Sequence, residues 1–381
     1  MRTGVALVTL CAIAFGLTYA DHAPLIPLVA TEFGLDDLGA GLLSTAVFLS
    51  YLVVTLVTAG WIVRVRPKLV VAVGLVCAAT GAALFASAPV YAVAIAAKAL
   101  QGLGSAVAFV SAQRYIAGLY GERRSHFGLG LYGSGFPLGS GLALIAMPAL
   151  AQLLGGWRAA FAIEAGVIAV VLVAWLAAPD VAATRPPGDM RDALRCRNCW
   201  ATFLEHAGGF GLGFSAATWI TVYLLREFSL PLTIAGLLGS GLLLMAVAGR
   251  TGGGWLSARG HLGSRATMRT AAMAILAGAA LLALPGRPLV VALLGALLVG
   301  IGVGIPYAAV FNTAAASLPS APGAAQGLAA TGGTAGAMVG APVMGFAVQT
   351  YGFAAAWAYL GVVAAMAFAV TFVMRGEEEL V

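Results

Sequence analysis

Long apolar runs recur from one end of this chain to the other, separated by short polar turns. A helix needs about 20 apolar residues to cross the hydrocarbon core of a bilayer. Charged residues make up only 9% of the 381 residues, whereas a soluble domain carries about 25%. A surface that faces water cannot be built from so few charges. The sequence therefore predicts an all-α integral membrane protein and argues against a soluble enzyme, a nucleic-acid-binding domain and a disordered chain.

The apolar runs predict helices because they do not show the alternation of barrel strands. Turn residues, such as those at Arg66–Lys68 and Gly155–Gly156, separate one run from the next. We expect twelve spans, at residues 5–29, 39–62, 69–87, 90–112, 127–150, 157–178, 200–224, 232–256, 268–285, 289–313, 325–349 and 353–374.

Lys and Arg are distributed unevenly between the predicted loops. With the N-terminus inside, sixteen of the 20 basic residues fall on the cytoplasmic side, three fall outside (Arg158, Arg226 and Arg287), and Lys98 lies within a span. This asymmetry follows the positive-inside rule, and an even number of spans places both termini in the cytoplasm. The lack of a presequence or of long extensions favours the cytoplasmic (inner) membrane of a prokaryote.

The longest polar stretch divides the spans into two sets of six. It predicts an N-terminal six-helix bundle at residues 1–178, a cytoplasmic linker at 179–199 and a C-terminal six-helix bundle at 200–381. Short segments recur in order in both halves: Glu32–Leu35 as Glu227–Leu230, Gly60-Trp61 as Gly254-Trp255, and Gly102–Gly104 as Gly300–Gly302. This pattern indicates a duplicated unit, and parallel repeats of this kind place a site at the repeat interface near the midplane of the membrane.

Several motifs make the chain resemble the major facilitator superfamily of secondary transporters. Lys98–Ala106 is similar to the span-four pattern R-x-x-Q-G-x-G-x-A of that family, with Lys98 in place of the arginine. Gly60–Lys68 stands where the family has the loop motif G-x-x-x-D-R-x-G-R, with Arg64 in place of the acid, and Gly254–Arg259 is its second copy. Gly133–Gly141 is similar to the span-five motif G-P-x-x-G-G of the family's antiporters, with altered spacing.

The resemblance implies two pseudo-symmetric bundles that expose a central site alternately to each side of the membrane. We expect a monomer that binds a small-molecule substrate and works in a lipid bilayer. The spans contain no nucleophile–base or metal-ligand set, so we expect no enzyme, cofactor or metal, and the net charge of +6 does not suggest a nucleic-acid partner. Gating or motif roles are expected for Gly60, Arg64, Lys68, Gly135, Pro137, Gly139, Arg250, Gly254 and Arg259.

Charged residues inside the spans are functional candidates, because burying a charge in a membrane is expensive. Lys98 lies roughly 12 Å from the outer face of the membrane and Asp21 lies within about 6 Å of the same depth, given the helix rise of 1.5 Å per residue. We therefore expect an Asp21–Lys98 pair, with His22 beside it as a proton relay. The alternatives are that Lys98 forms a purely structural ion pair, that Lys98 snorkels, and that the first span ends early, near Pro24, so that Asp21 faces external water.

Other polar positions yield weaker predictions. Further substrate-binding candidates on the presumed cavity helices are Gln101, Trp219, Tyr223, Tyr307 and Asn312. Glu205 and His206 are expected at a hydrated helix N-terminus, and Glu164 is expected to pack against Arg158. Cys196 and Cys199 provide only half of a zinc site, so we expect their spacing to be incidental.

Three functions fit this pattern. The altered span-five motif favours a proton-coupled exporter or antiporter of small organic or drug-like compounds. The embedded Lys98 instead favours a carrier of small anions of the carboxylate, nitrate or cyanate type, unless a carboxylate neutralises it. The degenerate loop motif leaves room for a membrane sensor that does not transport. No phosphate-binding Walker motif is present in the sequence, which argues against ATP as the energy source.

Overall fold

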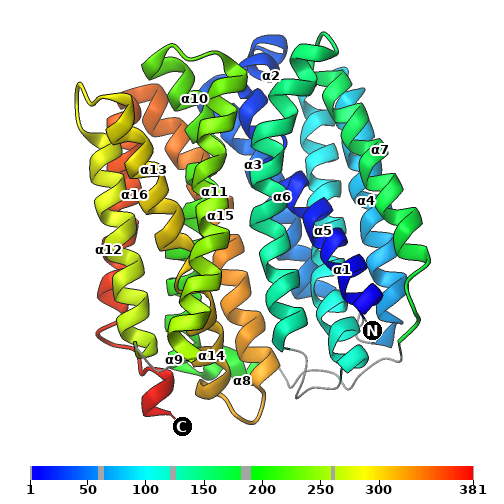
Figure 1. Cartoon of the computed structure of the whole chain (residues 1–381), viewed down its shortest axis with the longest axis vertical. Helices are drawn as coiled ribbons and strands as arrows, with labels where there is room; N and C mark the ends of the chain where they lie inside the picture. Colours follow the sequence, from blue (N-terminus) through cyan, green and yellow to red (C-terminus); the bar gives the residue numbers. More distant parts are fainter. Residues whose placement is uncertain (1, 59–63, 121–125, 182–189, 259–261, 381) are drawn as a thin grey trace. The chain divides into compact units, whose positions relative to one another are not determined.

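The computed structural model of the chain is helical throughout its described part, which comprises all residues except 1, 59–63, 121–125, 182–189, 259–261 and 381. The helices form two compact units. One consists of Met1–Leu35 and Leu42–Pro186, and the other consists of Asp36–Gly41 and Pro187–Val381. Figure 1 shows the chain coloured along its sequence, from blue at the N-terminus through green to red at the C-terminus.

Each predicted span contains at least one helix of the structure. In the first unit they are α1 (Arg2–Ala20), α2 (Ile26–Phe33), α3 (Asp37–Thr58, whose first turn belongs to the second unit), α4 (Pro67–Ala86), α5 (Tyr91–Tyr120), α6 (His126–Leu153) and α7 (Trp157–Leu176). In the second unit they are α8 (Met190–Arg195), α9 (Arg197–His206), α10 (Leu212–Phe228), α11 (Leu232–Ala258), α12 (Ser264–Ala283), α13 (Leu289–Gly304), α14 (Tyr307–Ser317), α15 (Pro322–Tyr351) and α16 (Phe353–Val370).

Eleven helices or broken helix runs among the described residues are long and apolar enough to cross a membrane. They account for every predicted span except 325–349, which is covered by α15. This helix has 30 residues and carries no Asp, Glu, Lys or Arg. Its many glycines and threonines lower its mean hydropathy. The chain is therefore an all-α, multi-pass membrane protein.

Three of the predicted spans are interrupted rather than continuous. The first breaks between α1 and α2, where Pro24 and Pro27 lack the backbone N–H that a continuous helix would use. The seventh passes through a π-helical turn at Ala207–Gly211, and the tenth breaks at Pro306 between α13 and α14. Such interruptions inside a membrane free backbone groups that must find new partners, so they mark places where polar side chains are needed.

The predicted linker contains ordered structure of its own. Helix α8 lies inside it, and α9 begins at Arg197 with Cys196 as its N-cap. The Cys196 sulfur accepts a hydrogen bond from the backbone N–H of Cys199 at 3.4 Å. The two-residue spacing of these cysteines therefore matches a helix cap. At the other end of the chain, Glu378 accepts hydrogen bonds from the backbone N–H and the hydroxyl of Ser264 at 3.0 and 2.6 Å, at the start of α12.

Helices α1 and α6 pack backbone to backbone through small residues of the span-five motif. A Cβ atom added at Gly139 would overlap the carbonyl oxygen of Ile13, and one added at Gly135 would lie 2.7 Å from the Cβ of Ala12. The hydroxyl of Ser140 stabilises the same contact by donating a hydrogen bond to the carbonyl of Gly16 at 2.6 Å. Pro137 lies within α6 between these contacts. Close approach of this kind is typical of helices that associate in lipid.

We expect Gly139→Ala to lower the stability of the protein by about 1–3 kcal/mol, the usual cost of overpacking. The added methyl group meets the backbone of α1, which cannot rotate away. Gly166→Ala in α7 is the matched control, since nothing lies within 4 Å of a Cβ added there. Apparent melting temperatures in detergent measure both effects. Equal melting temperatures for the two variants would show that helices α1 and α6 accommodate the added methyl group without loss of stability.

Candidate functional site

The break in the first span creates a polar site inside the first unit. In a continuous helix the carbonyl of Thr18 would accept from the backbone N–H of His22. That N–H instead donates to Asp21 Oδ1 at 2.6 Å. The freed Thr18 carbonyl accepts a hydrogen bond from Lys98 Nζ at 3.0 Å. The break thus gives the lysine of α5 a fixed acceptor at the end of α1.

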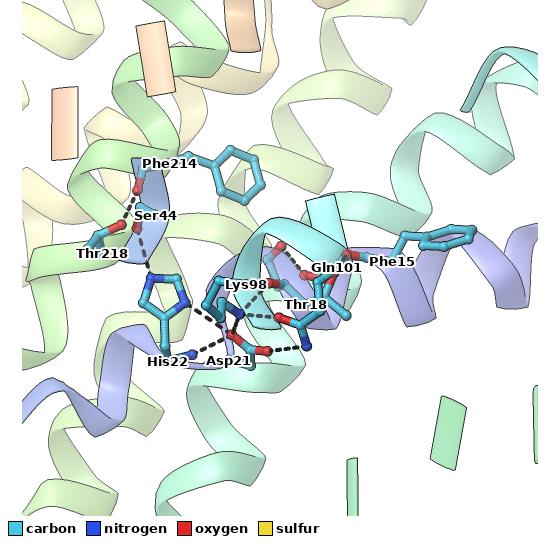
Figure 2. A network of polar contacts seen from close by, with 11 residues as sticks. Phe15, Thr18, Asp21, His22, Ser44, Lys98, Gln101, Phe214 and Thr218 are labelled. Atoms are coloured by element: carbon cyan, nitrogen blue, oxygen red, sulfur yellow. Dashed lines mark hydrogen bonds and ion pairs between the residues drawn. The ribbon is translucent and has the colours of Figure 1, made fainter. Parts of the chain in front are cut away.

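Lys98 is the centre of a hydrogen-bonded network (Figure 2). Its ammonium donates to Asp21 Oδ1 at 2.5 Å and to Gln101 Oε1 at 2.5 Å. Gln101 closes the ring by donating through Nε2 to Asp21 Oδ2 at 3.2 Å. The three donors of the ammonium therefore meet three acceptors, drawn from α1, the residue that follows it, and α5. The predicted Asp21–Lys98 pair is present in the structure.

His22 extends this network to α3. Its Nδ1 lies 3.0 Å from Asp21 Oδ1 and its Nε2 lies 2.8 Å from the hydroxyl of Ser44. Figure 2 shows the imidazole between the carboxylate and the serine. An imidazole with one ring nitrogen on a carboxylate and the other on a hydroxyl has the geometry of a proton relay. Ser44 is a member of the site that the sequence pattern alone did not indicate.

The network is closed off from solvent. Asp21, His22, Lys98 and Gln101 are each 0% exposed. Two of the three alternatives from the sequence are therefore wrong: Lys98 does not snorkel, and Asp21 does not face external water although the helix does break beside it. The desolvation free energy of a buried ion pair is offset only where the geometry is good and further hydrogen bonds satisfy both groups. The arrangement here meets that condition.

Glu164 does not pack against Arg158 as the sequence suggested. Arg158 instead pairs with Glu32, with its Nη2 2.6 Å from Glu32 Oε1. Glu164 is only 4% exposed and interacts electrostatically with Asp21 and Lys98. The signal that could have located it is helical spacing: the buried positions of α7 are Trp157, Ala160, Phe161, Glu164, Ile168, Val171 and Trp175.

A second cluster lies in the other unit, around the π-helical turn. The guanidinium carbon of Arg250 lies 4.1 Å from the ring centroid of Tyr307. His206 stacks on Phe210 at 5.2 Å between centroids and contacts Phe311 at 5.1 Å. Its Nδ1 lies 2.9 Å from the carbonyl of Ala329, which can only accept, so Nδ1 carries a proton. This cluster brings Arg250 and Tyr307 of the predicted residues together.

Glu205 and His206 are not at a hydrated helix N-terminus. They are 4% and 7% exposed. The expectation was wrong because the helix begins at Arg197, more than two turns before them, so the pair lies inside the membrane-spanning run.

The remaining substrate-binding candidates make none of the contacts described for the two clusters. Trp219 is fully buried and donates through Nε1 to the carbonyl of Ala341 at 2.8 Å. Arg287 donates a hydrogen bond through Nε to the hydroxyl of Tyr223. Asn312 is exposed on α14. The contacts of Trp219 and Tyr223 are those of helix packing.

The structure describes only some of the loop-motif residues. Gly60 and Arg259 lie outside the described residues. Arg64 is exposed, and a Cβ added at Gly254 would meet nothing within 4 Å. Lys68 donates to the carbonyls of Leu176 and Ala178 at 2.8 and 2.5 Å. It therefore joins the start of α4 to the end of α7, where a cation also complements the helix dipole. Among the described residues, no group of three or more His, Cys, Asp or Glu is placed to hold a metal ion.

Comparisons with known proteins agree with this architecture. The sequence profile of the Major Facilitator Superfamily matches residues 8–331. The fold is similar to a bacterial homologue of the human lysosomal transporter Spinster, in its inward-facing and unoccupied conformation, with a TM-score of 0.78 and 17% identity over 97% of this chain and 95% of that one. It is also similar to a mutant form of the nucleoside transporter NupG, with a TM-score of 0.75 and 14% identity over 98% and 99% of the two chains. A search of curated protein sequences found no match. Because the profile covers most of the chain, the protein belongs to the Major Facilitator Superfamily of transporters.

Proposed function

We propose that this protein is a proton-coupled secondary transporter that exports a small organic compound in exchange for protons. The observation that carries the proposal is the fully buried Asp21–Lys98 pair, with His22 bridging Asp21 to Ser44. Charged groups inside a membrane protein mark ion or proton pathways. A carboxylate, an imidazole and an ammonium in direct contact can gain, pass and release a proton without leaving the unit.

The proposed cycle follows from what holds Asp21 in its ionised form. Lys98, Gln101 and the backbone of His22 all donate to this carboxylate. Protonation of Asp21, by way of Ser44 and His22, removes the charge that pairs with Lys98 and weakens the ring of hydrogen bonds. In the proposed mechanism, this local change alters the relative stability of the inward-open and outward-open states, so that a ligand and protons are carried in opposite directions.

The pairing of Lys98 bears on the substrate. A small-anion carrier would present Lys98 to its substrate, whereas here Asp21 and Gln101 occupy the ammonium. This supports a neutral or cationic organic substrate over a carboxylate, nitrate or cyanate. The fold is shared with proteins described as a nucleoside transporter and as a homologue of a lysosomal transporter. We further propose that the protein works as a monomer in a prokaryotic inner membrane, with both termini in the cytoplasm.

Proton antiport predicts that a transported compound moves protons. Purified protein is reconstituted into liposomes that contain the pH-sensitive dye pyranine, and a panel is added outside: ethidium, tetraphenylphosphonium, uridine, nitrate and acetate. We expect one of the first three to change the internal pH in a protein-dependent way, and the rate to rise with an imposed pH gradient. Protein-free liposomes correct for passive permeation of each compound.

Two results would contradict the proposal in different ways. Proton-linked movement of nitrate or acetate alone would establish the anion carrier instead. Thermal stabilisation of the protein by a panel compound that moves neither itself nor protons would point to a non-transporting sensor, since a ligand that binds the native state must raise the apparent stability.

A further inference from the structure

Glu164 lies at the midpoint of the buried face of α7. Its neighbours on that face, Phe161 and Ile168, are fully buried, and Glu164 itself is 4% exposed. Neither carboxylate oxygen accepts a hydrogen bond from a described residue. A carboxylate that is buried at this depth without hydrogen-bond donors is far costlier than one that is paired. Packing alone does not explain a glutamate in this position.

The groups that face Glu164 belong to the proton-coupling network. Asp21 and Lys98 interact with it electrostatically. Lys98 Nζ lies 5.9 Å from the ring centroid of Phe161, which precedes Glu164 by about one helical turn. The lysine of α5 therefore reaches the face of α7 that carries the glutamate.

The other elements packed against α7 bring no charge to this point. Helix α6 carries no Asp, Glu, Lys or Arg along His126–Leu153. Helix α4 contributes Lys68, which is bound at the C-terminal end of α7, and the thiol of Cys77. On α7 itself, Arg158 is held by Glu32 at the opposite end. His22 also touches Asp21, with Nδ1 3.0 Å from the carboxylate and Nε2 2.8 Å from the Ser44 hydroxyl. A neutral imidazole that donates through Nδ1 and accepts through Nε2 fits both contacts and adds no charge. The local charge balance therefore depends on two carboxyl groups and one ammonium.

We propose that Glu164 is a second proton site of this transporter, which shares one proton and the Lys98 counter-ion with Asp21. This inference rests on the proton coupling proposed above. One ammonium can neutralise one carboxylate, so the other carboxyl must carry a proton to remain buried. In the described arrangement Asp21 accepts the hydrogen bonds of an ionised partner, whereas the hydrogen-bonding neighbour of Glu164 is the Asp21 carboxyl itself. Glu164 therefore holds the proton while Asp21 pairs with Lys98.

The exchange between the two sites is a single proton transfer. The O–H bond of Glu164 breaks and a new O–H bond forms on a carboxylate oxygen of Asp21. Glu164 becomes the anion, and the ammonium of Lys98 turns from Asp21 to Glu164. The net charge of the cluster is unchanged at each stage. The resting protein thus stores a proton on α7, beside the helix break in the first span.

Infrared spectroscopy tests this assignment because a protonated carboxyl has a C=O stretching band that an ionised carboxylate lacks. Spectra are recorded on purified resting protein near neutral pH, with no substrate added. We expect the spectrum of the wild type minus that of Glu164→Gln to show a protonated-carboxyl band, which is the Glu164 band. Glu205→Gln is the matched control, because Glu205 is also a buried glutamate with an oxygen that has no hydrogen-bond partner among the described residues. Removing Glu205 should leave the Glu164 band in place.

Two more variants keep Glu164 and probe its coupling. Asp21→Asn leaves Lys98 with Glu164 as its only carboxyl partner in the cluster, so Glu164 should ionise and its band should disappear. Lys98→Met removes the counter-ion, so both carboxyls should be protonated and the band should gain intensity. The proposal is overturned if the wild type and Glu164→Gln have the same protonated-carboxyl absorption, or if Asp21→Asn retains the Glu164 band. The spectra need no flux, so loss of transport activity with this band pattern present contradicts the proposed function alone.

Discussion

Replacing Lys98 by methionine is expected to lower the free energy of unfolding by roughly 3–5 kcal/mol, the usual cost of removing one partner from a buried ion pair. Methionine fills a similar volume, so the loss reports the charge and its hydrogen bonds. Asp21, Gln101 and the Thr18 carbonyl would each lose a donor at 2.5 to 3.0 Å. The apparent melting temperature in detergent is the measurement.

The control is an ion pair of the same unit that faces water. Arg66 and Asp180 lie 3.0 Å apart with side chains 76% and 52% exposed. Exposed pairs contribute about 0–1 kcal/mol, so Arg66→Met should melt close to the wild type. If Lys98→Met melts at the same temperature as Arg66→Met, the Asp21–Lys98 pair does not stabilise the fold.

The double variant Asp21→Asn/Lys98→Met should recover part of this loss, because neither charge is then left without its partner. Lys98→Met alone should also regain stability as the pH falls. Without the ammonium, the folded protein must bind protons on its buried carboxyls that the unfolded chain releases into water. Stability then decreases with rising pH, since the native state binds more protons than the unfolded state. A pH-independent deficit would assign the loss to packing.

The sequence was sufficient to predict the pairing of Asp21 with Lys98, for a simple geometric reason. A helix rises by a constant 1.5 Å per residue, so position along a span gives the depth of a residue in the membrane. Two opposite charges at similar depth are expected to pair, because an unpaired charge there is costly. The break near Pro24 was also predicted as an alternative. Its consequence was not, because burial of Asp21 depends on how α5 covers the broken end of α1.

Glu164 and His206 show what the sequence could not determine. The helical spacing around Glu164 indicated which face of α7 was buried, but not that this face lies beside Asp21 and Lys98. His206 was misplaced by a boundary error: the polar start of α9 does not resemble a span, so the helix was expected to begin later than Arg197. In both cases the missing information is which helices are neighbours and where a helix with a polar first turn begins.

Asp21→Asn is expected to abolish proton-driven transport while leaving the protein folded. Asparagine is nearly isosteric with aspartate, and its Oδ1 can still accept from Lys98 and from the backbone N–H of His22, which lie 2.5 and 2.6 Å from Asp21 Oδ1. It cannot bind or release a proton in the transport cycle. Accumulation driven by a pH gradient should fall to the level of protein-free liposomes, measured with whichever panel compound moves protons in the wild type. Downhill exchange of that compound should continue.

Glu32→Gln makes the same change of charge at the surface end of the same helical run. Glu32 pairs with Arg158 at 2.6 Å and its side chain is 44% exposed, so its removal should leave proton coupling intact. Full coupling in Asp21→Asn would show that protons are carried elsewhere, whereas equal loss in both variants would trace the effect to net charge. Loss of uphill transport only in Asp21→Asn separates the two roles of this site. Hydrogen bonds that an amide can also accept hold the broken helix together, and the ionisation of a single carboxyl couples it to the proton gradient.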